Sequence, residues 1–172
     1  EDLSKREYRI KLNNQTIPAL IAANLIKYLK IKPEEKLCCL NTKDGIISIE
    51  ANLAGIKNII AQDSNTNNIR NAKINAKMAN AQIKFTSKNE EDLDIEKQDF
   101  IIAHLIYSRE NKKAFKKIYD TFKLTEKILK NKLAIITNHP EDLKKFKPDK
   151  LKEIENLTIK HKKATSHIVI YE

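Results

Sequence analysis

The chain has 172 residues, a length that suits one domain with a substantial core. No run reaches the about 18 uninterrupted apolar residues that a membrane span needs, and no signal-peptide pattern opens the chain, so we expect a cytoplasmic protein without a membrane partner. The formal net charge of +10 favours an anionic partner, with nucleic acid first, although Lys, Ile and Asn are abundant throughout and such a bias raises the charge by itself.

Two residue types restrict the chemistry further. Cys38 and Cys39 are the only cysteines and are adjacent, which suits neither a disulfide nor a zinc site, so we expect buried strand residues and no metal. Gly45 and Gly55 are the only glycines. Nucleotide-type cofactor sites usually need several glycines where the backbone approaches the ligand, so this scarcity argues against an intact site of that kind.

The expected elements follow in chain order. Residues 1–9 form a polar, extended lead, and Thr16 caps a helix over 16–30 with an inner stripe of Leu20, Ala23, Leu25 and Leu29. Helical spacing also predicts helices at 46–54, 65–80 and 110–130. Short apolar runs typical of buried parallel strands lie at 37–40, 58–61, 83–85, 100–103 and 133–136, and two terminal strands are expected at 157–161 and 167–171.

The alternation of strands and helices predicts an α/β fold in one domain over residues 1–172. We expect a doubly wound, mostly parallel Rossmann-like sheet of about seven strands, with helices on both faces and an antiparallel C-terminal hairpin. Residues 1–30 supply the lead and first helix, and residues 31–172 form the core. Because the chain begins with Glu1 rather than Met, we expect it to be the C-terminal part of a longer protein.

Three segments, in the right order, resemble the catalytic domain of the THUMP-associated RNA methyltransferases. The first is LSKREYR at 3–9, followed by the alanine-rich start of a helix at 18–23. The second is Ile49-Glu50-Ala51 with Gly55, and the third is Asp63-Ser64-Asn65 followed by Ala72, Asn75 and Ala76. The resemblance implies a methyltransferase sheet, S-adenosylmethionine as the cofactor if one is bound, a tRNA or rRNA guanine amine (N2) as the methylated group, and an N-terminal RNA-binding domain in the same chain.

The cofactor loop of that family reads DPFCGSGT, and residues 39–46 align with it. Cys39 stands in place of the opening acid, Lys43 replaces the first loop glycine, and Gly45 is retained. The resemblance places the Lys43 side chain where the methionine and ribose parts of the cofactor lie. The alternative is that Lys43 and Asp44 form an ordinary turn at the surface.

Two further positions correspond to cofactor contacts in the family. Asp63 aligns with the acid that accepts hydrogen bonds from the ribose hydroxyls, much as the acid of dinucleotide folds does. Its alternative role is to cap the helix that begins near Asn65. Asn89 aligns with a further acid that contacts the adenine amine.

The catalytic loop of the family reads Asn-Pro-Pro-Tyr, and the aligned residues here are His104-Leu105-Ile106-Tyr107. Tyr107 retains the aromatic ring that stacks on a flipped base in the family. His104 replaces the asparagine amide and, when neutral, offers one acceptor nitrogen. A general base is one role for His104, and a structural histidine at the end of a strand is the other.

Basic residues supply candidate RNA contacts. Arg6, Arg9 and Arg109 are candidate phosphate clamps, and Lys112 and Lys113 project from the start of the long helix. A second group of lysines surrounds Pro148 at 144–152. Each cluster by itself is typical of a solvated face. Few aromatic residues stand among these lysines in the sequence, so base stacking beyond Tyr107 is not expected.

These features favour a methyltransferase-like domain with eroded cofactor and catalytic motifs, that is, a weak or inactive homologue that acts in RNA binding or tRNA modification. The alternative is an active S-adenosylmethionine-dependent RNA guanine methyltransferase with a divergent site, served by Asp63, Asn89, His104 and Tyr107. A second alternative is a protein-interaction platform that uses the long helix.

Overall fold

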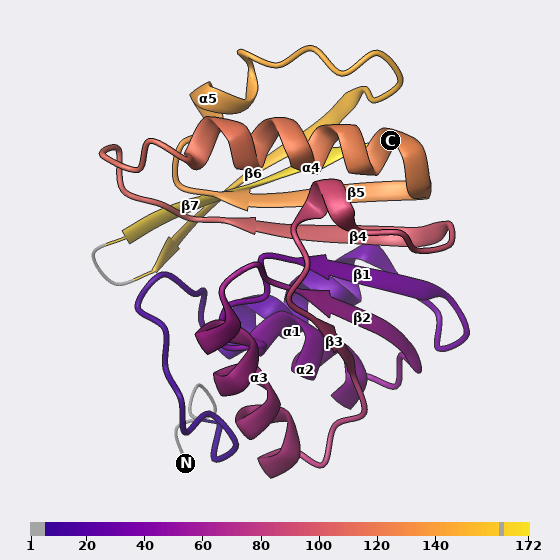
Figure 1. Cartoon of the computed structure of the whole chain (residues 1–172), viewed down its shortest axis with the longest axis vertical. Coiled ribbons are helices and arrows are strands. Elements are labelled where there is room, and N and C mark those ends of the chain that lie inside the picture. Colours follow the sequence, from indigo (N-terminus) through magenta and orange to yellow (C-terminus); the bar gives the residue numbers. More distant parts are fainter. Residues whose placement is uncertain (1–5, 162–163) are drawn as a thin grey trace.

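A seven-stranded sheet in the order β3-β2-β1-β4-β5-β7-β6 runs through the molecule (Figure 1). A computed structural model describes residues 6–161 and 164–172, so the start of the LSKREYR run lies outside the described part. Strands β1 to β5 pair in parallel, and β7 pairs antiparallel with β5 and β6, which confirms the predicted mixed sheet and its C-terminal hairpin. The strands are β1 Lys36–Leu40, β2 Asn58–Gln62, β3 Lys84–Thr86, β4 Gln98–Leu105, β5 Leu129–Thr137, β6 Glu153–His161 and β7 Ala164–Tyr171.

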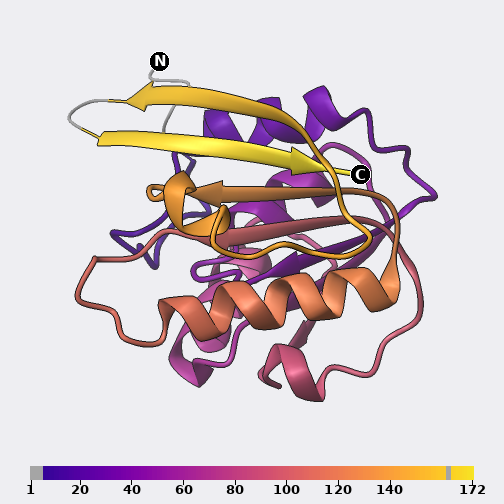
Figure 2. The same ribbon diagram turned by 90° about the horizontal axis from the view of Figure 1, so that it is seen from above.

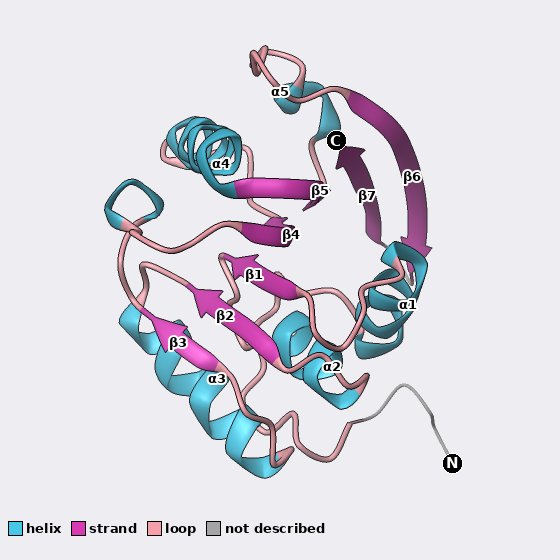
Figure 3. Cartoon of the chain, turned by 90° about the vertical axis from the view of Figure 1, so that its right-hand side faces the viewer, coloured by secondary structure: helices cyan, strands magenta, loops and turns pink. Residues whose placement is uncertain are grey.

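Helices cover both faces of the sheet, as predicted. Figure 3 shows α1, α2 and α3 on one side and α4 on the other, and Figure 2 shows α4 running along the sheet from above. Gly45 precedes α2 and Gly55 follows it, both with positive φ, so the predicted glycine stop at residue 55 is confirmed. The helices are α1 Ala19–Leu29, α2 Ile46–Leu53, α3 Thr66–Met78, α4 Ala114–Ile128 and the short α5 Pro140–Leu143, with a 3-10 turn at Glu90–Asp92.

The central strands are apolar on both faces because both faces are buried. Leu37 and Cys39 of β1 pack in the cluster that contains α1 and α2. Cys38 and Leu40 point the other way and pack in the cluster that contains α4. The two cysteines are therefore buried strand residues on opposite faces of the sheet, and the expectation of buried, free cysteines is confirmed.

Several predicted boundaries were wrong, and tertiary contacts explain the differences. The first helix begins at Ala19, and the hydroxyl of Thr16 donates to the Asn13 carbonyl (2.7 Å) instead of capping it. Leu20 is exposed and lies outside the inner stripe. The fourth strand continues to Leu105 because Leu105 pairs with Thr137 of β5, so His104 lies within the strand rather than after it.

The α4 face of the sheet carries less helix than the α1 face. Parallel strands are usually joined by a helical crossover. In the described part of the chain, the connection from β3 to β4 contains only the 3-10 turn, and the one from β5 to β6 contains only the four-residue α5. As a result, α4 is the one long helix that the described residues place on this face, and parts of its surface remain uncovered. No helix in the described residues is both long and apolar enough to cross a membrane.

Candidate functional site

A cavity of about 230 Å³ opens at the carboxyl ends of β1, β2 and β4. The strand order reverses between β1 and β4, and ligands of open α/β sheets bind outside the carboxyl ends of strands at such a switch point. The lining comes from the lead segment, from the loops after β1 and β2, from β4 and from α4. It includes Gln15, Asn41, Lys43, Asp63, His104 and Lys117.

The loop after β1 is held in an unusual backbone conformation. Asn41 and Lys43 have φ of 54° and 53°, and Gly45 has φ of 83°. Such values cost about 1–3 kcal/mol for a residue such as lysine, which therefore needs support from its surroundings. A Cβ added to Gly45 would lie 3.0 Å from the Cβ of Ala72 in α3, so this glycine permits α3 to pack closely against the loop.

Lys43 fills the centre of this site with its own side chain. Its ammonium group donates to the carbonyl oxygen of Ile106 (2.8 Å) and to that of Gln15 (3.2 Å). Burial lowers the pKa of Lys43 to about 8, with Lys117 acting in the same direction and with Asp63 and Asp44 opposing the shift. Both Lys43 and Asp44 are buried, so the alternative of an exposed turn at these two residues was wrong.

Asp63 links the loops that follow β1 and β2. One carboxylate oxygen accepts from the backbone N–H of Lys43 (2.9 Å) and the side-chain amide of Asn68 (3.0 Å), and the other accepts from the backbone N–H of Asn65 (2.9 Å). The N-cap of α3 is Asn65, whose side chain accepts from the N–H groups of the first turn, so the capping role considered for Asp63 belongs to Asn65. Three of the roughly four acceptor positions of Asp63 are therefore taken within the protein.

His104 faces the cavity from β4 with 1% of its surface exposed. Neither ring nitrogen has a hydrogen-bond partner among the described residues. Burial lowers the pKa of His104 well below its usual value, and the nearby charges of Lys43 and Arg9 lower it further, so the ring is neutral. A buried, unpaired imidazole with one donor and one acceptor can receive a ligand group, because such groups are otherwise costly to bury.

Tyr107 lines the same cavity but is largely buried. Its hydroxyl donates to the carboxylate of Asp142 (2.9 Å), and its ring lies 5.0 Å from that of His139. Asn138, which follows β5, accepts from the Tyr107 N–H (3.1 Å) and donates to the Tyr107 carbonyl (2.8 Å), so it holds this segment from both sides. With 7% of its surface exposed, the Tyr107 ring does not offer the open stacking face that the resemblance implies.

Cys39 and Asn89, the other two cofactor candidates, do not line the cavity. Cys39 packs in the apolar core, and Asn89 is exposed and donates to Asp92 (3.2 Å). The next residue, Glu90, is buried and accepts from the side-chain amide of Asn41 (2.9 Å). The sequence could not single it out, because Glu90 is the first of three consecutive acids and only the folded chain turns it inward.

Two of the arginines that were predicted to contact phosphate lie in the lead segment, and both form ion pairs within the protein. Arg6 binds Glu50 (2.8 Å), and Arg9 binds Asp44 (2.9 Å). These pairs hold the lead against α2 and the loop after β1, and a role of either arginine in RNA binding stays a prediction. Arg109 forms an exposed pair with Glu141 (2.6 Å), and Lys112 and Lys113 are exposed at the start of α4.

Lys117 also lines the cavity, a position that the sequence did not single out among the lysines at the start of the long helix. Its ammonium group donates to the side-chain oxygen of Asn41 (2.7 Å) and lies 4.0 Å from the Glu90 carboxylate. The only signal for it was its position near the start of a lysine-rich helix, and several of its neighbours share that position. The fold thus brings two lysines, Lys43 and Lys117, to one cavity.

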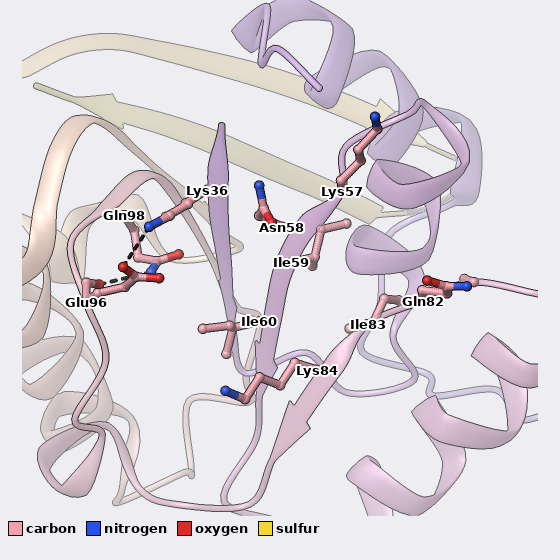
Figure 4. A pocket seen from close by; sticks show the side chains of 11 residues that line it. Lys36, Lys57, Asn58, Ile59, Ile60, Gln82, Ile83, Lys84, Glu96 and Gln98 are labelled. Atoms are coloured by element: carbon pink, nitrogen blue, oxygen red, sulfur yellow. Dashed lines mark hydrogen bonds and ion pairs between the residues drawn. The ribbon is translucent and has the colours of Figure 1, made fainter. Parts of the chain in front are cut away.

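A hollow with a larger volume, about 530 Å³, lies at the amino ends of β1 and β2 (Figure 4). Its rim carries Lys36, which is paired with Glu96 (2.6 Å), together with Lys57 and Lys84. It lies at the sheet edge opposite to the ligand-binding edge, and none of the predicted site residues lines it. Among the described residues no group of three or more His, Cys, Asp or Glu side chains could hold a metal ion.

No protein-family model and no curated protein sequence matches this chain. Solved structures with the same fold do. TrmN from Thermus thermophilus is 18% identical with a TM-score of 0.86, over 98% of this chain and 52% of that one. A predicted N6-adenine-specific DNA methylase from Listeria monocytogenes is 17% identical with a TM-score of 0.78, over 96% and 54%. The tRNA (uracil-54, C5)-methyltransferase of Pyrococcus abyssi, in complex with S-adenosyl-L-homocysteine, is 16% identical with a TM-score of 0.63, over 88% and 38%.

These similarities concern the fold alone, at identities of 16–18%. This chain spans about half the length of the first two structures. In this chain the matching fold consists of a parallel core and an antiparallel hairpin at the C-terminal edge of the sheet. The chain therefore has the Rossmann-like fold of the methyltransferases.

Proposed function

We propose that this chain is an RNA-binding domain of methyltransferase fold that does not transfer a methyl group from S-adenosylmethionine. The observation that carries the proposal is the buried side chain of Lys43, which lines the cavity at the carboxyl ends of the strands and binds the Ile106 carbonyl (2.8 Å). In the resembling family a glycine stands at this position of the loop, and the space above it belongs to the cofactor.

The residues present do not fit the cofactor, for three reasons. The methyl donor is a sulfonium cation, and a second cation at close range in a partly dry cavity repels it. The cavity volume of about 230 Å³ is below the ~300–1,000 Å³ of typical small-molecule sites. Asp63 already accepts three hydrogen bonds from the protein, so ribose hydroxyls have to compete with them.

The RNA part of the proposal rests on the net charge of the chain and on the named activity of one protein that has the same fold. The net charge of +10 suits a polyanion. One of the proteins with this fold is described as a tRNA methyltransferase. Exposed lysines also lie along α4 and on the loop that follows α5.

An active enzyme with a divergent site is the second candidate, and His104 favours it. Its buried imidazole has no hydrogen-bond partner among the described residues and can bind a polar ligand group, at the position that a substrate-binding asparagine takes in the resembling family. This candidate requires Lys43 to leave the cavity when the cofactor enters, which breaks its bonds to Ile106 and Gln15.

The test is a calorimetric titration of the protein with S-adenosylmethionine, together with the variants Lys43→Gly and Lys43→Met. We expect no binding to the wild type at millimolar ligand and measurable binding to Lys43→Gly, which removes both the charge and the bulk and suits the positive φ. Lys43→Met keeps the bulk without the charge, so it separates steric exclusion from repulsion. A ligand at one hundred times its dissociation constant adds ~2.7 kcal/mol of stability, which a thermal shift detects independently.

Micromolar binding to the wild type contradicts the proposal. Methyl transfer to tRNA by the wild type that is lost in Asp63→Ala establishes the second candidate. If Lys43→Gly binds no better than the wild type, Lys43 is not the obstacle and the argument from its side chain is wrong.

A further inference from the structure

We infer that the groove between α4 and residues 145–149 binds a single-stranded segment of RNA, with its bases stacked on aromatic rings of the protein and its phosphates near lysines. The inference deepens the proposed RNA-binding role and rests on it. The groove has a volume of about 270 Å³ and is separate from the cavity at the carboxyl edge of the sheet. Residues from Tyr119 to Glu126 form one wall, and the segment after α5 forms the other.

The groove exists because the connection from β5 to β6 contains only the short helix α5 and leaves part of α4 uncovered. In Figure 1, α5 and the loop that follows it lie next to α4. Since α5 has four residues, this connection covers α4 only in part. Phe122 anchors the inner side of α4, with its ring 5.3 Å from that of Tyr171 in the core.

Two aromatic rings remain on the outer surface of α4, one turn apart. Phe115 is 44% exposed and Tyr119 is 49% exposed. Phe146 from the opposite wall lies 6.2 Å from Phe115 and 6.4 Å from Phe122, measured between ring centroids. Tyr119 lines the groove, and Phe115 lies beside it next to Phe146. Exposed aromatic rings of this kind offer flat surfaces on which unpaired bases stack.

A lysine ammonium group lies over each of these rings, so a base that stacks on a ring has to displace that group toward the phosphates. The ammonium group of Lys145 lies 4.7 Å from the centre of the Phe115 ring, and that of Lys123 lies 5.7 Å from the centre of the Tyr119 ring. Lys145 also binds Asp142 (2.7 Å), whereas Lys123 and Lys147 form no ion pair with other described residues. Two acids, Glu126 and Asp149, line the same groove, and Glu126 is occupied by the backbone N–H of Lys150 (3.0 Å).

Charge complementarity favours a nucleic acid over an apolar protein partner. A protein that covered the rings would have to bury or displace the lysines beside them, which costs free energy unless it supplied acids. A single strand satisfies both features at once, because its bases stack and its phosphates stay at the rim. A duplex cannot use the rings in this way, since its bases are already stacked.

The decisive measurement is fluorescence anisotropy with a labelled 12-nucleotide oligouridine, compared with an RNA duplex of equal length, at two salt concentrations. We expect the wild type to prefer the single strand. Replacement of a stacking residue, in Tyr119→Ala or Phe115→Ala, is expected to weaken binding between ~5-fold and ~100-fold. Tyr28→Ala is the matched control, because Tyr28 is equally exposed at 49% but lies on α1, across the sheet.

The lysines provide a second, independent readout. Lys123→Gln with Lys147→Gln should lower the slope of log affinity against log salt by about 1.4, because each phosphate contact of a single strand contributes about 0.7. If Tyr119→Ala and Phe115→Ala bind RNA as tightly as the wild type, the groove is not the binding site. The same conclusion follows if the wild type binds the duplex as tightly as the single strand. In both cases the proposed RNA-binding function is retained. If no RNA binds even at low salt, the proposed function fails together with the groove.

Discussion

The ammonium group of Lys43 lies 2.8 Å from the carbonyl oxygen of Ile106, so one buried side chain joins the loop after β1 to the segment after β4. These two segments align with the cofactor loop and the catalytic loop of the family that the sequence resembles. Here they are connected by the protein itself. The same ammonium group also reaches the Gln15 carbonyl in the lead segment (3.2 Å), so three parts of the chain converge on one charge.

This buried amine predicts a specific dependence of stability on pH. The usual pKa of 10.5 applies in the unfolded chain, and burial lowers the pKa to about 8 in the folded one. Between these values the unfolded state binds the extra proton, so the contribution of Lys43 to the free energy of unfolding rises with pH and is lost as the pH falls through about 8.

We therefore expect Lys43→Met to gain stability over the wild type at pH 7 and to lose most of that advantage by pH 10. The difference should approach ~3 kcal/mol at most, since each unit of pKa corresponds to about 1.4 kcal/mol. Urea unfolding of both proteins under reducing conditions at several pH values measures it. A difference that stays constant over this range contradicts the assignment.

Alanine substitution at the two glycines measures how closely α3 packs against the loop after β1. Gly45→Ala places a Cβ 3.0 Å from the Cβ of Ala72 at a φ of 83°, whereas Gly55→Ala meets nothing within 4 Å at a φ of 102°. We expect both variants to lose ~1–3 kcal/mol from backbone strain, and Gly45→Ala to lose a further ~1–3 kcal/mol from overpacking. Thermal or urea unfolding measures the loss of stability in each variant. Equal losses would show that α3 moves away from the added Cβ without a loss of free energy.

His104 is expected to tolerate an apolar ring in the isolated protein. Both its nitrogens are buried without a partner among the described residues, so His104→Phe removes two unpaired polar atoms and keeps a similar shape. The free energy of unfolding should be unchanged or higher. A loss of more than ~2 kcal/mol would mean that the ring makes a hydrogen bond that the structure does not contain.

Nitrogen chemical shifts provide the companion measurement on the wild type. Burial and the charges of Lys43 and Arg9 lower the pKa of His104, so its ring should still be neutral at pH 6.5, where an ordinary imidazole is half protonated. The pKa should rise in Lys43→Met, in which one of those charges is absent. An imidazole that titrates normally would show that the ring is reached by solvent.

Asn138 is predicted to control the segment that contains Tyr107. Asn138→Ala removes the bonds to the Tyr107 N–H (3.1 Å) and carbonyl (2.8 Å), so we expect a loss of ~1–3 kcal/mol in stability. Amide hydrogen exchange at Tyr107 should become faster, while exchange in the paired part of β4 should stay slow. Equal acceleration throughout β4 would instead indicate global destabilisation.

Local pattern in the sequence was sufficient for the central architecture. The apolar runs at 37–40, 58–61, 100–103 and 133–136 predicted the core strands, because strands buried on both faces are continuously apolar. Gly55 marked the end of α2, because a positive φ after a helix suits glycine. Strand and helix alternation then restricted the topology to a mostly parallel sheet.

The functional surfaces were decided by contacts between residues far apart in the chain. The sequence contains a lysine at position 43, but its burial depends on the carbonyls of Gln15 and Ile106. Phe115 and Lys145 are thirty residues apart and carry no common pattern, yet the fold brings the ammonium group within 4.7 Å of the ring centre. Periodicity reports which side of an element is buried, whereas the free energy of an ion pair or a filled cavity depends on which distant segments meet. Only the tertiary structure decides that.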